Sequence, residues 1–367
     1  MDIRGQIRSL PLGSIIDGYL GRAFLRIFFC SVLITTSLYF IVDFFDQIGT
    51  VLDNGPPVWS VIRYFFYSAP LSISRVIGFA TLFSALFCLG MAARTNEITA
   101  MRASGISVQR IAFPLLMVSM VIALFTFFWN ETLVPIFAHQ AQTIYQTEIR
   151  KKQQQSLLGT HDIWIRGQNS FINIASFDPR SNTLEHVMVF LLNPDFSLRG
   201  FVEIPRAQWN GHAWEVKEAT SWNTDDQMVK GEANTLPAIS ETPADLKLLD
   251  RSPDEFSFFD LESEISKMKA KGMDTTSVEV DLQNKLALPL ISPLMVLLST
   301  PFALKRRMTS GLALSFGAAM VIGFGYWMLT AFCISLGHSG ALPAWVAAWL
   351  PSSIFTLIGF FYFTAEE

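Results

Sequence analysis

The sequence predicts a polytopic α-helical membrane protein in which six transmembrane helices carry one inserted, all-β domain. Only 16% of the 367 residues are charged, whereas an average soluble domain carries about 25%. Of the 58 charged residues, 38 lie between Glu131 and Lys285, and this segment has a net charge of −8. Short runs with strand-like alternation replace the long apolar runs there, so this segment is expected to fold outside the membrane.

Six apolar segments have the length of membrane spans. Because a helix rises about 1.5 Å per residue and the hydrocarbon core is about 30 Å thick, a span needs roughly 20 apolar residues. The expected spans are residues 24–48, 64–93, 111–130 and 286–304, one within 308–337 and one within 341–365. The first has a charge-free core at 27–42, and Arg75 interrupts the second.

Basic residues gather on one side of the expected spans. With a cytoplasmic N-terminus, the inner ends carry Arg4, Arg8, Arg22, Arg26, Arg94, Arg102, Arg110, Lys305, Arg306 and Arg307. The short outer loops carry Arg63 and little else. The positive-inside rule then puts both termini in the cytoplasm and the inserted domain outside, in the periplasm of a Gram-negative bacterium. The expected divisions are 1–130, 131–285 for the β-domain with its flanking helices, and 286–367.

The inserted segment begins and ends with helical patterns and has strand patterns between them. A helix at 138–155 is expected to continue the third span, and one at 261–271 has Asp260 as its N-cap and Gly272 as its C-cap. Alternation at 163–165, 172–174 and 187–192 predicts strands, with turn residues at 168–169 and 193–195. Residues 207–216 predict a hairpin with Asn210-Gly211 as a type I′ turn. Short strands at this spacing are typical of a β-sandwich or a jelly-roll-like domain.

Several classes of protein are not indicated by the residues. No Gly-Lys-Ser/Thr phosphate loop occurs, so nucleotide hydrolysis by this chain is not expected. The five histidines are scattered, and Cys30, Cys88 and Cys333 all lie in apolar runs, where cysteine behaves as a small packing residue. We therefore expect no metal, no cofactor and no catalytic centre. The formal net charge of −4 gives no indication of nucleic-acid binding.

A short cytoplasmic helix is expected at about 95–104, between the second and third spans. Thr95 or Asn96 can cap it, Glu97 lies in its first turn where the helix dipole favours a carboxylate, and Gly105 can supply the left-handed stop. The spacing i, i+3, i+4 places Ile98, Met101 and Arg102 on one face. Such a helix is either a rigid handle for a cytoplasmic partner or an amphipathic helix resting on lipid headgroups. The pattern alone does not choose between them.

Motifs along nearly the whole chain resemble the lipopolysaccharide-export permeases of the LptF/LptG family. The cytoplasmic helix is similar to their coupling helix. The other matching stretches are Asp17-Gly-Tyr-Leu-Gly-Arg22, Asp43-Phe-Phe-Asp-Gln47, Leu89-Gly-Met-Ala-Ala-Arg94, Lys285-Leu-Ala-Leu-Pro289 and Ala348-Trp-Leu-Pro351. Those of the first span look more like LptG than LptF, and the resemblance is weakest at 155–255.

The resemblance implies a function and a set of partners. Family members pair as an LptF–LptG heterodimer of twelve spans, bound to two copies of the ATPase LptB and joined by one helix of LptC. Lipopolysaccharide enters the cavity between the permeases from the outer leaflet and leaves through their β-jelly-roll domains. By this analogy Glu97 contacts the ATPase, and the coupling set is Glu97, Ile98, Met101, Arg102 and Gly105.

The substrate-binding residues are less well indicated. The familiar LptG pattern has a basic residue where this chain has Asp43, so the family's phosphate contacts are not carried over. The candidates are Arg63, Arg75, Phe40 and Phe79. Because an arginine within a span is costly, Arg75 is expected either to face the substrate or to pair with Asp43 or Asp46.

A different class of function remains open, namely a membrane scaffold or sensor that relays ATPase-driven motion to the outer domain without moving lipid. An open apolar cavity facing a partner favours transport, and tight packing of small residues favours a relay.

Overall fold

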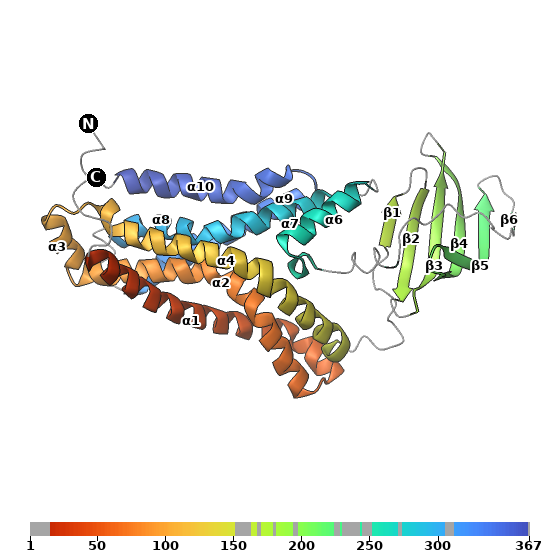
Figure 1. Ribbon diagram of the computed structural model, residues 1–367, viewed down its shortest axis with the longest axis horizontal. Coiled ribbons are helices and arrows are strands. Elements are labelled where there is room, and N and C mark those ends of the chain that lie inside the picture. Colours follow the sequence, from red (N-terminus) through yellow and green to blue (C-terminus); the bar gives the residue numbers. More distant parts are fainter. Residues whose placement is uncertain are drawn as a thin grey trace.

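The computed structural model describes residues 15–150, 163–166, 170–178, 181–193, 197–223, 228–229, 243, 252–270, 274–304 and 312–365. Figure 1 shows a bundle of long helices with an antiparallel sheet beyond one of its ends. Five of the basic residues counted under the positive-inside rule lie outside the described residues, namely Arg4, Arg8, Lys305, Arg306 and Arg307.

Six helices in this described part are long and apolar enough to cross a membrane, which confirms the predicted number. They are α1 (Ile15–Asn54), α2 (Val58–Arg94), α4 (Val108–Ile144), the pair α7 (Thr276–Ala287) and α8 (Ile291–Leu304), α9 (Leu312–His338) and α10 (Ala344–Ala365). Several exceed the predicted spans. Hydropathy detects only the membrane-crossing stretch, whereas backbone hydrogen bonding continues each helix through its polar ends.

The third and fourth spans both extend toward the sheet. A single π-helical turn, Tyr145–Ile149, continues α4, so the predicted extension from residue 138 is present as far as the described residues reach. The fourth span begins ten residues earlier than predicted, at Thr276, and a 3₁₀ turn at Leu288–Leu290 joins its two parts. Pro289 lies in that turn, where its missing N–H interrupts α-helical hydrogen bonding.

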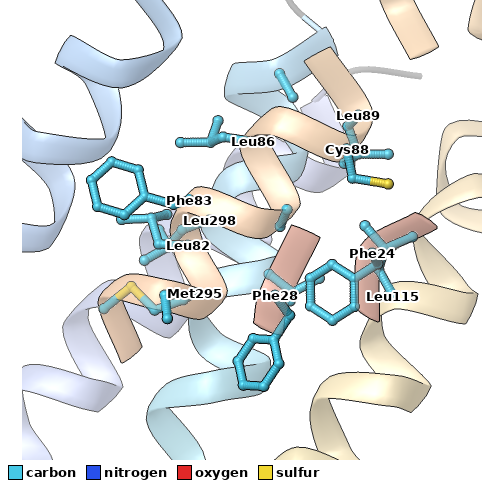
Figure 2. Close-up of a cluster of buried hydrophobic side chains, with 14 of the residues drawn as sticks. Phe24, Phe28, Leu82, Phe83, Leu86, Cys88, Leu89, Leu115, Met295 and Leu298 are labelled. Carbon is cyan, nitrogen blue, oxygen red and sulfur yellow. The ribbon is translucent and has the colours of Figure 1, made fainter. Parts of the chain in front are cut away.

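Helix α2 lies at the centre of the bundle and packs on α1, α4, α8 and α9. The buried cluster around it, shown in Figure 2, brings together Phe24 of α1, Leu86 of α2, Leu115 of α4 and Met295 of α8. Small residues allow the close approach: a Cβ at Gly78 would lie 2.5 Å from Cγ2 of Ile291. By contrast, α1, α9 and α10 leave most of their membrane-crossing residues uncovered within this single chain.

The sheet contains β1 (Ile163–Arg166), β2 (Ser170–Asp178), β3 (Thr183–Leu192), β4 (Leu198–Trp209), β5 (Trp214–Asn223) and β6 (Met228–Val229). Each strand pairs antiparallel with its neighbour in the chain, giving the order β1 to β6. This confirms the inserted all-β region, and the described strands form one up-and-down sheet. The predicted turn residues 168–169 and 194–195 lie outside the described residues.

The core-facing residues of three strands change their spacing at one row of the sheet. The buried apolar residues step by three positions instead of two in β2 (Ile174 to Phe177) and in β3 (Leu184 to Val187). In β4 the step runs from Ile204 to Ala207 across a register shift that contains Pro205. Because side chains alternate with period two, such a step requires an irregularity, and His186 takes it up in β3 with a φ of 49°.

The hairpin between β4 and β5 is present, but its turn is not the predicted type I′. Trp209 pairs with Trp214, so the loop has four residues, from Asn210 to Ala213. Gly211 has a φ of 102°, whereas Asn210 is not in the left-handed region that a type I′ turn requires. Instead the Asn210 Oδ1 accepts hydrogen bonds from the backbone N–H groups of His212 and Ala213, at 2.9 and 2.8 Å. The amide side chain replaces the backbone turn that the sequence pair suggested.

Helix α6 (Phe258–Ala270) begins earlier than predicted, and Asp260 is not its N-cap. The Ser257 Oγ accepts from the backbone N–H of Asp260 at 3.1 Å and donates to its carboxylate at 2.8 Å. Ser257 is therefore the capping residue, and Asp260 stands at the third helical position. The predicted C-cap Gly272 lies outside the described residues.

Candidate functional site

The predicted cytoplasmic helix is α3 (Glu97–Ala103), which joins α2 to α4. Gly105 ends it with a φ of 86°, as predicted. Its N–H donates to the carbonyl of Arg102 at 3.0 Å, and the next N–H, of Ile106, donates to Met101 at 3.1 Å. These two bonds form a Schellman motif, which fixes the end of the helix.

The start of α3 differs from the prediction that Thr95 or Asn96 caps it. Asn96 holds the cap position with a left-handed φ of 62°, but its side chain makes no capping hydrogen bond. The Thr95 hydroxyl donates to the Glu97 carboxylate at 2.9 Å rather than accepting from the helix. The first turn of α3 is thus shaped by backbone conformation and by Glu97.

The α3 helix has one face on the bundle and one free face. Ile98 is buried, and Met101 packs against the same core cluster. Arg102, which the spacing places on the same face of the helix, is exposed. The exposed side chains of α3 are Thr99, Ala100, Arg102 and Ala103. A helix anchored on one side and open on the other can receive another protein without disturbing the core.

Side chains of α1 and α4 make polar contacts at the end of the bundle that carries α3. The Tyr19 hydroxyl of α1 donates to the second carboxylate oxygen of Glu97 at 3.0 Å. Two residues earlier, Asp17 accepts two hydrogen bonds from Arg110 of α4, at 2.6 and 2.8 Å. Both partners of this pair are less than one-fifth exposed. A bidentate, charge-assisted pair of this kind is strong and directional.

Arg75 lies near the middle of α2, beside the segment that returns from the sheet. Its Nη2 contacts Asp254 at 2.8 Å and its Nη1 donates to the Tyr39 hydroxyl at 2.9 Å. The structure therefore corrects the expected pairing with Asp43 or Asp46, because Asp254 is brought to Arg75 from 179 residues away. Half of the Arg75 side chain remains exposed, and its contact with substrate stays a prediction.

Three membrane helices hold the segment that returns from the sheet. We call residues 252–258 the connector. Besides Arg75 of α2, Glu131 of α4 accepts from the backbone N–H of Phe258 at 2.7 Å, and Lys285 of α7 donates to the carbonyl of Phe256 at 2.9 Å. The His139 ring lies 2.7 Å from the Glu255 carboxylate. The connector is thus attached by polar contacts to α2, α4 and α7.

The other substrate candidates occupy separate places. Arg63 pairs with Glu148 at 3.3 Å, near the π-helical end of the third span. The Phe40 ring packs on Phe65, with 5.4 Å between ring centroids. Phe79 lies against α9, because a Cβ at Gly323 would be 2.6 Å from its ring. Substrate binding by these residues stays a prediction, and the tight packing of Phe79 does not favour a position in a cavity.

The sequence did not predict the residues that contact Glu97, Arg110 and Arg75. Tyr19 and Asp17 belong to the first motif that resembled the family, so a signal for them existed, but it gave no partner. Asp254 and Glu255 carried no signal beyond lying among charged residues before a helix. In the described part of the chain, no group of three or more His, Cys, Asp or Glu side chains could hold a metal ion.

Comparison with known proteins gives one consistent result. Residues 18–365 match the protein family "Lipopolysaccharide export system permease LptF/LptG". The lipopolysaccharide export system permease protein LptG of Escherichia coli (strain K12) is 23% identical over 362 residues, covering 95% of this chain and 97% of that protein. The protein of the same name from Haemophilus influenzae (strain ATCC 51907) is 21% identical, covering 94% of this chain and 96% of its own. The resemblance predicted from the motifs is confirmed, and this chain belongs to the lipopolysaccharide export permease family LptF/LptG.

Proposed function

We propose that this chain is one of two permease subunits in an ATP-driven exporter, and that it moves lipopolysaccharide from the outer leaflet into its own β-domain. Family membership already makes it a multi-pass inner-membrane component of a lipopolysaccharide export system. The proposal adds the partners, the orientation and the path. The observation that carries it is α3, a fixed helix with a free outer face at the end of the bundle away from the sheet (Figure 1).

The shape of α3 suits a docking site for an ATPase. Its end is fixed by the Schellman motif, its inner face is packed through Ile98, and its Glu97 carboxylate is held by Tyr19 and Thr95. A preorganised helix costs little further ordering when a partner binds. The chain has no phosphate-binding loop of its own, so two copies of an LptB-like ATPase are expected to supply the work.

The charge distribution supports the orientation. Arg94 and Arg102 flank or lie within α3, and Arg110 follows close after it, whereas Arg63 lies near the opposite end of α2. The positive-inside rule then places α3 in the cytoplasm and the sheet in the periplasm. An LptC-like partner on that side would receive the glycolipid.

The uncovered helix faces support a second permease and a lipid path. Large apolar side chains point away from the single chain on α1, α9 and α10. Examples are Phe29, Leu33, Ile34, Leu38, Phe45, Val321, Phe324, Trp327, Phe332, Leu357 and Phe361. An LptF-like partner facing α1 would enclose an apolar cavity between the two subunits. Removing a glycolipid from the membrane costs about 0.8 kcal/mol for each CH₂ that leaves it, so the export needs an external energy source.

One observation favours the alternative function, a membrane scaffold that relays ATPase-driven motion without moving lipid. Small residues of α2, such as Gly78 and Ala80, pack tightly against neighbouring helices, which suits a rigid transmitter. It differs from export in one measurable respect, since a relay carries no glycolipid.

The test is what co-purifies with the chain. Affinity purification from detergent-solubilised inner membranes should retain a second six-span protein, a Walker-type ATPase and bound lipopolysaccharide. Glu97→Lys should reduce the retained ATPase while the chain stays in the membrane. Glu262→Lys, a charge reversal at an exposed position of α6, is the matched control, and this variant should retain the ATPase. Purification of the chain alone, with its own ATPase activity, would overturn the proposal. Complete partners that never retain glycolipid would favour the relay.

A further inference from the structure

Helix α1 makes polar contacts with other helices at two places along its length. At the cytoplasmic end, Tyr19 contacts Glu97 of α3 and Asp17 is paired with Arg110 of α4. Farther along α1, fifteen residues before its end at Asn54, the Tyr39 hydroxyl accepts from Arg75 of α2, which also holds Asp254 of the connector. Helix α1 therefore contacts α3 directly and the connector indirectly, through Arg75.

The distance between these attachments matches the thickness of a membrane. Tyr19 and Tyr39 are twenty residues apart on a continuous helix, which corresponds to about 30 Å along its axis. The hydrocarbon core of a bilayer has about the same thickness. A helix of this length can carry a displacement from one membrane surface to the other as a rigid rod.

The burial of the two helices next to α3 indicates which one can move. Helix α2 is central, and its close contact at Gly78 with Ile291 leaves no room for a shift without repacking the core. Helix α1 has four buried residues, Leu20, Gly21, Phe24 and Phe28, whereas α2 has eighteen. Beyond Phe28 it exposes Leu33, Ile34 and Leu38, so its movement disturbs fewer contacts within this chain. A displacement of α3 can therefore shift α1 with less repacking of the core than a shift of α2 would require.

We propose that Asp17, Tyr19 and Arg110 are positioning residues that tie α1 to the docking helix. Displacement of α3 by a bound ATPase then shifts α1, and the shift reaches the connector through Tyr39, Arg75 and Asp254. This inference rests on the proposed function, because it needs an ATPase on α3. It assigns a role to the ion pair of Asp17 with Arg110, which lies outside α3 and is not needed for the exposed face of that helix.

The experiment uses the whole exporter reconstituted in proteoliposomes with lipopolysaccharide. ATP hydrolysis and glycolipid release to an acceptor protein are measured on the same sample, and their ratio is the readout. Tyr19→Phe removes one hydroxyl, and Asp17→Asn removes one charge. Asp17→Asn is expected to leave ATPase association unchanged and to lower glycolipid released per ATP by roughly 5-fold or more, the range of a coupling interaction. Tyr19→Phe also frees the Glu97 carboxylate of α3, so its ratio is measured with the ATPase in saturating excess, where the same decrease is expected. Ser37→Ala is the matched control, because the Ser37 hydroxyl bonds only to its own helix, at Leu33.

A charge exchange separates coupling from folding. Asp17→Arg alone should uncouple the exporter, and combining it with Arg110→Asp should restore the ratio to within about twofold of the unmodified protein, because the ion pair is re-formed in reverse. Full coupling in both Tyr19→Phe and Asp17→Asn would overturn the inference while leaving the proposed function intact. Loss of ATPase association in Asp17→Asn would also overturn it, since the ion pair with Arg110 would then only shape α3. An unmodified exporter that releases no glycolipid would instead refute the proposed function.

Discussion

Replacing Gly105 by alanine tests whether the end of α3 must be formed before the ATPase binds. A Cβ at Gly105 would meet no atom within 4 Å, so the substitution adds no clash. Its only cost is conformational, because the φ of 86° is in the region that L-residues avoid at a cost of about 1–2 kcal/mol. A helix of seven residues is marginal on its own, so this cost acts directly on the population of formed α3.

The expected result is a weaker complex, with an upper limit set by that energy. Because 1.4 kcal/mol corresponds to a factor of ten, Gly105→Ala should raise the Kd for the ATPase by roughly 5- to 30-fold at most. The Kd of Gly105→Asn should lie between those of the unmodified chain and Gly105→Ala, since asparagine adopts the left-handed conformation more readily than alanine. Titration of the detergent-solubilised permease pair with labelled ATPase measures the three Kd values.

The control is Gly49→Ala in α1, where a Cβ also meets nothing within 4 Å but the backbone is helical. This variant should bind the ATPase as the unmodified chain does. Equal affinity of Gly105→Ala and Gly49→Ala would show that the ATPase does not require the Schellman end of α3. An affinity loss well above 30-fold would show that Gly105 itself lies in the interface.

Three further outcomes are expected. Gly323→Leu should destabilise the bundle by about 1–3 kcal/mol through overpacking against Phe79, measured as a lower Tm in detergent; an unchanged Tm would mean that α9 can move away from α2. A photo-crosslinker at Phe40 should capture glycolipid in the assembled exporter, whereas one at Phe79 should form bonds within the chain; mass spectrometry of the adducts distinguishes these results. Asp254→Asn should make the connector more susceptible to limited proteolysis, and Arg75→Gln should do the same; protection equal to that of the unmodified protein would remove the role of this ion pair.

The membrane fold was predictable because it depends on local composition. Each span had to be apolar and long enough, and six such runs were visible in the sequence. Gly105 was equally predictable, since a glycine after a short amphipathic stretch is the ordinary way to end a helix. The helix limits were not predictable, because polar residues such as Asp17 remain helical beyond the membrane when another helix supplies a partner.

The site was only partly predictable, because its organising contacts join residues far apart in the chain. Tyr19 and Glu97 are 78 positions apart, and no local pattern pairs a hydroxyl on one helix with a carboxylate at the start of another. The hairpin turn failed for a different reason, since the Asn210 side chain supplied hydrogen bonds that a backbone turn would otherwise provide. Propensity rules count residue types in a turn and do not include this competition between side chain and backbone.

Arg75 shows how substrate binding and motion of the β-domain can be linked. Its guanidinium has five N–H donors, and the two contacts to Tyr39 and Asp254 leave part of the group exposed. A lipid phosphate is anionic, like the Asp254 carboxylate, and can also accept two hydrogen bonds from one guanidinium, so the two would compete for the same cation. If phosphate reaches Arg75, the connector loses one of its attachments while Glu131 and Lys285 still hold it. Loading of the glycolipid would then loosen the β-domain before any ATP is consumed, and Asp254→Asn should raise the yield of glycolipid adducts at Phe40.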